Sequence, residues 1–76
     1  MTLDKMPVGA EALISSIGGN EKTRLKLLDL GFTPRTGVRI RQITLHGDVT
    51  RVELRGYEVA LSKDEVSAVD AVLIKK

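Results

Sequence analysis

The sequence predicts a mainly β fold, a small barrel of about five short strands with one short helix, built as a single domain over residues 1–76. Short apolar runs recur along the chain between glycine or polar turn residues, as strands do. Only one segment, rich in leucine, has helical spacing and a helix cap before it. The chain of 76 residues has no cysteine, so it has no disulfide framework and a closed sheet without exposed edges is favoured.

The first two predicted elements are a short N-terminal turn and a strand. Leu3 and Met6 lie three positions apart, so one helical turn places both against an end of the core. Residues 10–17, AEALISSI, alternate imperfectly and predict the first strand. Its two faces carry Ala10, Ala12 and Ile14 on one side, and Leu13 and Ile17 on the other.

The predicted helix begins after Asn20, whose side-chain oxygen can accept a hydrogen bond from a free backbone N–H of the first turn. Glu21 then stands where the helix dipole favours a negative charge. The apolar positions of the helix recur at helical spacing and are expected to be core residues that shape the fold. These positions are Leu25, Leu27, Leu28 and Leu30.

The helix is predicted to stop at Gly31, which can adopt the left-handed conformation at the C′ position. Phe32 then occupies C″ and Leu27 occupies C3, and an apolar contact between these two positions is typical of a Schellman stop. Pro34 indicates a turn that leads the chain into the next strand.

A β-hairpin is predicted next, with strands over residues 37–45 and 49–55 and the turn HGD over residues 46–48. In the register that we expect, Arg41 faces Glu53 and Arg39 faces Arg55. Opposite charges directly across a strand pair are favourable, whereas like charges cost stability. The arginine pair would therefore suit an acidic partner, and Arg39, Arg41 and Arg55 form one candidate partner-binding face.

The apolar phase of this hairpin slips, because Val38 and Ile40 are even-numbered whereas Ile43 and Leu45 are odd-numbered. Either a β-bulge or strong twist returns the residues near the turn to the core, or Ile43, Leu45 and Val49 lie on the outer face. An exposed aliphatic cluster beside a turn is typical of a protein–protein contact. We predict that Leu45 is exposed and that these three residues bind a partner.

Residues 57–62 and 71–74 predict the fourth and fifth strands. The fourth strand is expected to point three side chains toward the core: Tyr57, Val59 and Leu61. Ser62 and Glu65 match the S-x-x-E capping box and predict a single helical turn between the two strands. Five strands of this length with tight turns fit an SH3-like barrel.

Composition argues against catalysis and against nucleic acid binding. The chain has one histidine and no cysteine, and no nucleophile triad, phosphate loop or pair of catalytic carboxylates is recognisable. The net charge is only +2, and one Phe and one Tyr cannot build a platform for base stacking. His46 and Asp48 on the hairpin turn have no third ligand nearby in sequence, so no metal site and no cofactor are expected.

Two segments, RLKLLDLGFTPRTGVRI over residues 24–40 and GYEVALSKDEVSAV over residues 56–69, resemble the FeoA family, small accessory proteins of bacterial ferrous iron uptake. The matching positions are Arg24, Leu25, Leu28, Leu30, Gly31, Pro34, Val38, Ile40, Ala60 and Leu61. The family usually has Gly after the proline, and here that residue is Arg35. The departure suggests a type I turn in which Gly37 takes any positive φ.

The resemblance implies an SH3-like barrel that works with FeoB, the membrane GTPase that carries ferrous iron. No segment is apolar enough for a signal peptide or a membrane span, so a cytoplasmic protein without direct membrane insertion is expected. We therefore expect a non-enzymatic accessory protein that acts by protein–protein contact and is capable of weak homo-oligomers. The alternatives are a small barrel that binds nucleic acid through its arginine-bearing strands, and a metal-dependent regulatory domain.

Overall fold

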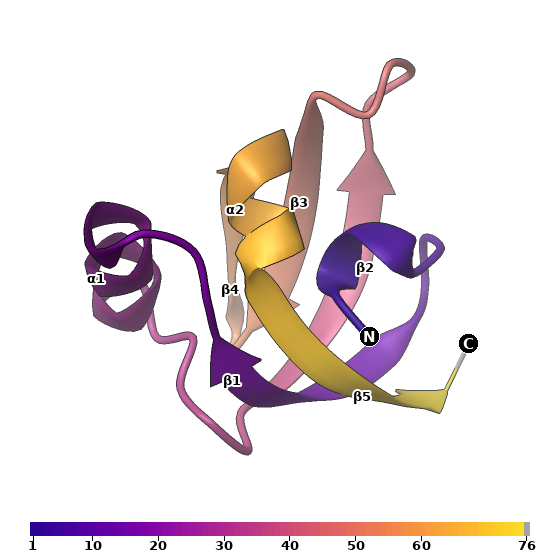
Figure 1. Cartoon of the computed structure of the whole chain (residues 1–76). Helices are drawn as coiled ribbons and strands as arrows, with labels where there is room; N and C mark the ends of the chain where they lie inside the picture. Colours follow the sequence, from indigo (N-terminus) through magenta and orange to yellow (C-terminus); the bar gives the residue numbers. More distant parts are fainter. Residues whose placement is uncertain (76) are drawn as a thin grey trace.

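The computed structural model describes residues 1–75 and contains five strands, two α-helices and one 3₁₀ turn (Figure 1). In chain order the elements are η1 (Leu3–Lys5), β1 (Glu11–Ile17), α1 (Glu21–Asp29), β2 (Gly37–Ile43), β3 (Val49–Leu54), β4 (Tyr57–Ser62), α2 (Lys63–Ala68) and β5 (Val69–Lys75). The mainly β prediction with five strands is confirmed, and the fourth strand has the bounds that the sequence predicted.

The strands form one antiparallel sheet in the order β4-β3-β2-β1-β5. Within residues 1–75 no ladder joins β4 to β5, so the hydrogen-bonded closure expected from the sequence is not formed. α2 instead connects these two outer strands along the chain and packs against both of them. α2 therefore bridges the two edges of the strongly twisted sheet (Figure 1).

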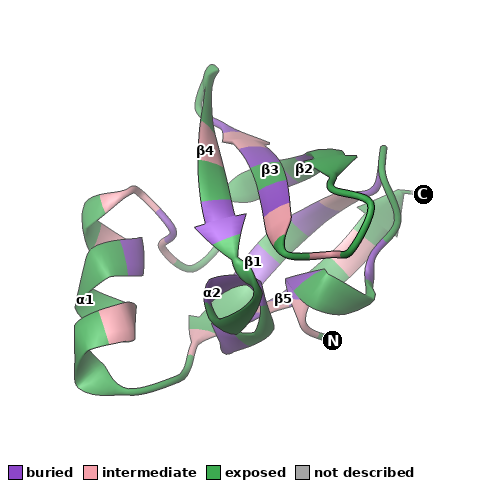
Figure 2. Ribbon diagram, turned by 90° about the horizontal axis from the view of Figure 1, so that it is seen from above, coloured by how far each residue is buried: buried purple, intermediate pink, exposed green. Residues whose placement is uncertain are grey.

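The core lies on one side of this curved sheet, and buried and exposed residues alternate along the strands (Figure 2). Its largest fully buried side chains are Phe32, Leu3, Ile14, Leu27, Ile40, Leu54, Leu61, Val52 and Val69. Leu3 and Met6 are both buried at one end of the core, as their spacing predicted. These two residues cover an end of the barrel that the strands leave open.

The stop of α1 has the predicted Schellman geometry. Gly31 has a φ of 103°, and its N–H donates to the carbonyl of Leu28 at 3.0 Å. The Phe32 N–H donates to the carbonyl of Leu27 at 3.0 Å, and both of these side chains are fully buried. The stop therefore turns the chain and fixes Phe32 in the core in a single step.

The start of α1 is also as predicted, since the Asn20 side chain accepts from the Thr23 N–H at 2.8 Å. Its apolar face is narrower than expected. Leu27 is fully buried, but Leu25 is 49% exposed, so its assignment to the core is wrong. Two positions along a helix differ by about 200° in direction, so a short helix that packs through Leu27 points Leu25 away from the barrel.

The turn after the helix differs from the expectation. Arg35 itself has a positive φ of 69°, whereas Gly37 is not in the left-handed region. The Thr36 N–H donates to the Thr33 carbonyl at 3.1 Å, which places Arg35 at the third position of the turn. A positive φ there is the mark of a type II turn, so the type I turn suggested for Pro34 and Arg35 is wrong.

Two further side chains differ from the prediction in how far they are buried. Tyr57 pairs with the buried Leu54 and therefore lies on the core side of β4, as predicted, but at its edge. Tyr57 is 42% exposed, and its hydroxyl donates to the Leu30 carbonyl at the end of α1. Ile17 was expected on the outer face but is half-buried and packs against the core. For Ile17 the cause is a shift in the β1–β5 register between Ile14 and Ser16, because one extra residue reverses the alternation.

Candidate protein-interaction site

The most prominent surface feature is the β2–β3 hairpin, whose connecting loop over residues 44–48 projects from the body of the barrel (Figure 1). We call this loop the hairpin tip. Thr44 organises it, since its N–H donates to the Val49 carbonyl at 3.0 Å and its hydroxyl accepts from the Val49 N–H at 3.1 Å. The Gly47 N–H donates to the Thr44 carbonyl at 2.9 Å. The tip is therefore an ordered turn.

A β-bulge lies in β2 just before the tip. Ile40 pairs with Val52, whereas the next pair is Gln42 with Arg51, so Arg41 is the extra residue. The extra residue shifts the alternation of side chains by one position, so that Ile43 faces the same side of the sheet as Ile40. Ile43 pairs with Thr50, whose side chain is buried. The bulge interpretation of the phase slip is therefore correct for Ile43, which is 37% exposed and points to the core side of the sheet.

Leu45 is the residue that the bulge does not return to the core. It is 93% exposed, the largest value among the large hydrophobic residues, which confirms the prediction that it is exposed in the isolated chain. Val49 is half-buried at the base of the tip. Val49 pairs with the exposed Ser62 and precedes the buried Thr50, so it faces the outer side of the sheet. The expected cluster of three outward-facing residues therefore loses Ile43, which faces the core side, and keeps the projecting Leu45 and Val49.

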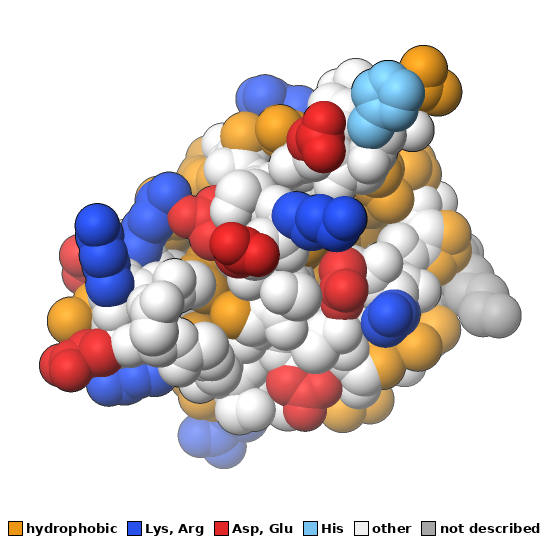
Figure 3. All heavy atoms as spheres, turned by 45° about the horizontal axis from the view of Figure 1, so that its top comes forward, with side chains coloured by type: hydrophobic (Ala, Val, Ile, Leu, Met, Phe, Trp, Pro, Cys, Tyr) orange, Lys and Arg blue, Asp and Glu red, His pale blue; other side chains and the backbone are white. Residues whose placement is uncertain are grey.

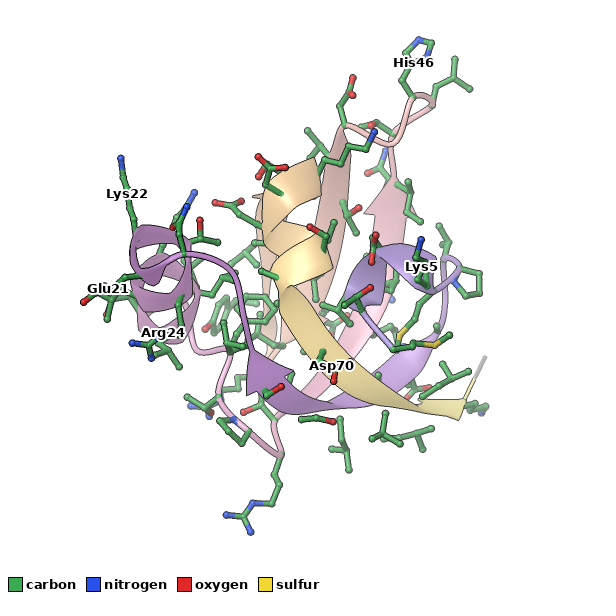
Figure 4. All side chains as sticks on the ribbon, viewed as in Figure 1. Lys5, Glu21, Lys22, Arg24, His46 and Asp70 are labelled. Atoms are coloured by element: carbon green, nitrogen blue, oxygen red, sulfur yellow. The ribbon has the colours of Figure 1, made fainter. Side chains whose placement is uncertain are left out.

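A pocket of about 200 Å³ opens beside this leucine, between the tip, η1 and α2. We call it the tip pocket. Its lining residues are Leu3, Asp4, Ile43, His46, Gly47, Thr50, Lys63 and Val66. Leu3, Thr50 and Val66 are buried, whereas Asp4, His46 and Lys63 are exposed, so an apolar floor has a charged and polar rim. Figure 4 labels His46 at the outer end of the tip.

The sequence did not predict the tip pocket, because its walls come from three separate parts of the chain: η1, the β2–β3 hairpin and α2. The spacing of Leu3 and Met6 had predicted that η1 covers an end of the core. The capping box of α2 had likewise predicted a helical turn that presents Val66. What the sequence did not contain was the packing of these two elements beside the hairpin.

The candidate arginine face is paired differently from the expectation. Arg39 lies opposite Glu53 in the β2–β3 ladder and opposite Glu11 in the β1–β2 ladder, and its guanidinium is 3.0 Å from the Glu11 carboxylate. The predicted juxtaposition of Arg39 with Arg55 is therefore wrong, because the bulge changes the register. The predicted ion pair between Arg41 and Glu53 is present at 3.4 Å. The charges of this face largely cancel.

Arg55 contacts the turn after α1. Its guanidinium donates to the hydroxyls of Thr33 and Thr36 at 3.0 and 3.1 Å. Thr36 is buried, so Arg55 satisfies a polar group that the fold removes from water. This contact gives Arg55 a clear role in stabilising the turn.

One ionisable group has a perturbed pKa. Glu65 accepts hydrogen bonds from the ammonium of Lys26 on α1 and from the Ser62 N–H of the capping box. The hydrogen bond from Lys26, followed by the capping contacts, lowers the pKa of Glu65 against the opposing effect of its burial. This ion pair attaches α1 to α2 and lies apart from the hairpin tip.

Within residues 1–75 no group of three or more His, Cys, Asp or Glu side chains is placed to hold a metal ion. In the same part of the chain, neither helix has the length and apolar composition needed to cross a bilayer. The arrangement that remains is an exposed aliphatic residue beside a partly apolar pocket, which suits binding of another protein surface.

Comparison with solved structures shows how widely this fold is shared. A FeoA-like protein from Clostridium acetobutylicum is 24% identical, with a TM-score of 0.91, and the match covers 100% of this chain and 88% of that one. FeoA from Stenotrophomonas maltophilia, solved with zinc and described as a prokaryotic SH3 domain protein, is 25% identical with a TM-score of 0.84 and coverages of 95% and 89%. The SH3-like architecture is thereby confirmed.

A manganese-dependent transcriptional repressor contains the same fold, with a TM-score of 0.90 at 14% identity, over 97% of this chain and 36% of that one. Its low identity shows the fold alone. No match was found among the curated proteins. The model of the FeoA domain matches residues 1–72, which is nearly the whole sequence, so the chain belongs to the FeoA domain family.

Proposed function

We propose that this protein is a non-enzymatic, cytoplasmic accessory factor of ferrous iron uptake that docks on the GTPase-containing cytosolic part of an FeoB-type transporter. Family membership supports the link to iron uptake. The FeoA protein of Stenotrophomonas maltophilia is described as possibly acting as an activating factor of ferrous iron transport. Guanine nucleotide binding and hydrolysis then belong to the partner.

The observation that carries the docking proposal is the exposure of Leu45 on an ordered turn. A leucine that is 93% exposed contributes little to the stability of the isolated fold. Its burial against a partner contributes roughly 1.5–3 kcal/mol to the free energy of binding. Ile43 and the rim of the tip pocket lie on the core side of the hairpin below the tip, and Val49 lies on its outer face. The docking surface is therefore assigned to the hairpin tip.

The arginine face is a weaker candidate for docking. Arg39 and Arg41 have acidic neighbours on adjacent strands, and Arg51 pairs with Glu58 at 3.1 Å on the same sheet. An anionic partner would have to compete with these carboxylates for each guanidinium. The same pairing argues against binding of a nucleic acid backbone, which needs cations free to replace condensed counterions.

Titration of the purified chain into the isolated cytosolic GTPase domain of an FeoB-type transporter tests the proposal by calorimetry. We expect a saturable 1:1 interaction that changes little between low and high salt, because an apolar residue dominates the contact. The chain alone is expected to hydrolyse no GTP. No binding to the domain, combined with salt-sensitive binding to RNA or DNA, would favour the nucleic acid alternative instead.

A further inference from the structure

We propose that the outer face of β1 and β5 binds the surface of an anionic lipid bilayer, through three exposed aliphatic side chains and the cations beside them. We call Leu13, Val72 and Ile74 the β1–β5 patch. In Figure 1 the two strands lie at the lower end of the molecule, whereas the hairpin tip lies at the upper end. The inference does not depend on the proposed function.

The three side chains of the β1–β5 patch form one apolar surface. Leu13 lies directly opposite Val72 in the β1–β5 ladder, and Ile74 is the extra residue of a bulge two positions further along β5. Ile74 lines an open cavity together with Glu11 and Arg39, so it faces the outer side of the sheet as they do.

All three aliphatic side chains are in contact with water in the isolated chain. Val72 and Ile74 are 61% and 59% exposed, and Leu13 is 40% exposed. Single exposed aliphatic residues are ordinary on a protein surface. Neighbouring ones on two paired strands are typical of a surface that contacts a protein or a membrane. The charges beside the patch decide between these two.

Two arginines next to the β1–β5 patch form no ion pair with any carboxylate of residues 1–75. The Arg35 N–H donates to the carbonyl of Ile14 at 2.7 Å, which places Arg35 beside the residue that follows Leu13. Arg55 lines the same cavity as Ile74, and its guanidinium donates to two threonine hydroxyls, which are uncharged. Both arginines therefore remain available to an anionic surface.

The carboxylates on the two strands are already paired. Glu11 lies 3.0 Å from the Arg39 guanidinium, and Asp70 lies 3.0 Å from the ammonium group of Met1. Lys75, the residue after Ile74, adds a further exposed cation. The outer face of β1 and β5 is therefore lined by cations at its margin, without a free carboxylate to repel an anionic headgroup.

The free carboxylates lie on other elements. Figure 3 brings the hairpin end of the molecule forward and shows acidic side chains spread over the face that carries the single pale-blue histidine. The side-chain carboxylates of residues 1–75 that form no ion pair belong to η1, α1, the hairpin tip and α2: Asp4, Glu21, Asp29, Asp48 and Asp64. None of them is on β1 or β5. The charge asymmetry therefore orients the β1–β5 patch toward an anionic surface.

An anionic bilayer offers both halves of this contact. Aliphatic side chains enter the headgroup region, while the long stems of arginine and lysine keep their charges at the level of the phosphates. Three partly exposed aliphatic groups give a weak, reversible contact that lies on the membrane surface. Because the patch and the hairpin tip are at opposite ends, the contact leaves the tip accessible to a protein.

Co-sedimentation of the full chain with lipid vesicles tests the proposal. Vesicles made from equal parts of phosphatidylglycerol and phosphatidylcholine supply the anionic surface, and vesicles of phosphatidylcholine alone supply a neutral one. We expect binding to the anionic vesicles that weakens as the salt concentration rises. Binding to the neutral vesicles should be weaker by at least roughly tenfold, because the arginines and Lys75 then meet no net charge.

Val72→Asp tests the aliphatic part of the contact, since it replaces an exposed valine of the patch by an anion. Leu45→Asp makes the matching change at the hairpin tip. We expect Val72→Asp to lose at least roughly tenfold in affinity for the anionic vesicles, and Leu45→Asp to bind them as the wild type does. Circular dichroism melting checks that both variants fold.

Arg35→Gly tests the cationic part with a variant that relieves a positive φ and therefore keeps the fold. Loss of one cation near an anionic surface should weaken vesicle binding about fivefold. Lys22→Gln removes one exposed positive charge from α1, where Figure 4 labels this residue, and serves as the control of equal charge. Its affinity for the vesicles should stay close to that of the wild type.

Absence of binding to the anionic vesicles, or equal binding to both kinds of vesicle, would overturn the proposal. So would undiminished binding by a folded Val72→Asp variant together with Arg35→Gly. Sedimentation equilibrium without lipid examines a second copy of the chain as the occupant, and a dimer that Val72→Asp dissociates would equally overturn the bilayer contact. Binding to the transporter domain is measured without lipid, so its failure is distinguishable from failure here.

Discussion

Two residues with positive φ between α1 and β2, Gly31 and Arg35, determine the path of the chain from the helix to the strand. Gly31 lies under the hydroxyl of Tyr57, which donates to the carbonyl of Leu30. A Cβ at this position would stand 2.6 Å from that hydroxyl oxygen. The glycine is therefore required both for its backbone conformation and for the space it leaves.

Gly31→Ala is expected to destabilise the fold by more than the roughly 1–2 kcal/mol of a left-handed alanine, because Tyr57 must also move. Urea denaturation measures the loss of unfolding free energy. Gly37→Ala is the matched control, since Gly37 is outside the left-handed region and nothing lies within 4 Å of its added Cβ. Equal stability of the two variants would contradict the assigned role of Gly31.

Arg35→Gly should stabilise the protein, because it relieves a non-glycine residue at a φ of 69°. The relief of about 1–2 kcal/mol is partly offset by the 0.5–1 kcal/mol entropy that glycine loses on folding, so we expect a net gain of roughly 0.5–1 kcal/mol. Arg35→Ala keeps the strained backbone and should show no such gain. Thermal melting compares the two, and a gain in the alanine variant alone would refute the argument.

At the scale of elements, the helix caps and the helix stop were predicted correctly because each depends on contacts within a few residues. The caps at Asn20 and Ser62 and the stop at Gly31 each involve backbone groups of one turn. The exposure of Leu25 could not be predicted in this way, because it depends on which side of α1 faces the barrel. Propensity and spacing do not contain that information.

The β2–β3 hairpin likewise has one feature that the sequence predicted and one that it could not. The phase slip in its sequence revealed that the register must change, and thereby that Leu45 was a candidate for exposure. The slip did not show where the bulge lies, because several positions of one extra residue satisfy the same pattern. The structure places it at Arg41, so that Arg39 lies opposite Glu53 and not opposite Arg55.

The attachment of α1 to α2 gives a prediction for pH. The pKa of Glu65 is lowered below its ordinary value of 4.5 in the folded state, mainly by Lys26. The unfolded chain therefore binds the proton more readily, so the stabilisation is present above pH 4.5 and disappears as the pH falls through the lowered pKa. Glu65→Gln can retain the capping box but removes the ion pair.

Melting temperatures of the wild type and Glu65→Gln should therefore differ near neutral pH and converge in acid. Asp64→Asn is a suitable control, because Asp64 is an exposed neighbour in the same first turn. A difference between wild type and Glu65→Gln that stays constant down to the lowest accessible pH would show that the ion pair is not its source.

At the scale of the whole molecule, the two ends of the barrel differ in character. One end carries α1, which is held by the ion pair between Lys26 and Glu65 of α2 and by the hydrogen bond from the Tyr57 hydroxyl to the Leu30 carbonyl. Both contacts stabilise the fold. The hairpin tip carries a leucine that is 93% exposed and therefore contributes little to the stability of the isolated fold. The proposed docking surface is thereby separate from the contacts that stabilise the fold.

The most direct test of this account measures the affinity of Leu45→Asp for the cytosolic GTPase domain of an FeoB-type transporter. Val72→Asp is the control, because Val72 is also an aliphatic residue, 61% exposed, but lies on β5 away from the tip. We predict an unchanged melting temperature and at least a roughly tenfold loss of affinity for Leu45→Asp, with wild-type affinity for Val72→Asp. Wild-type affinity in a folded Leu45→Asp variant would contradict the assignment of docking to the hairpin tip.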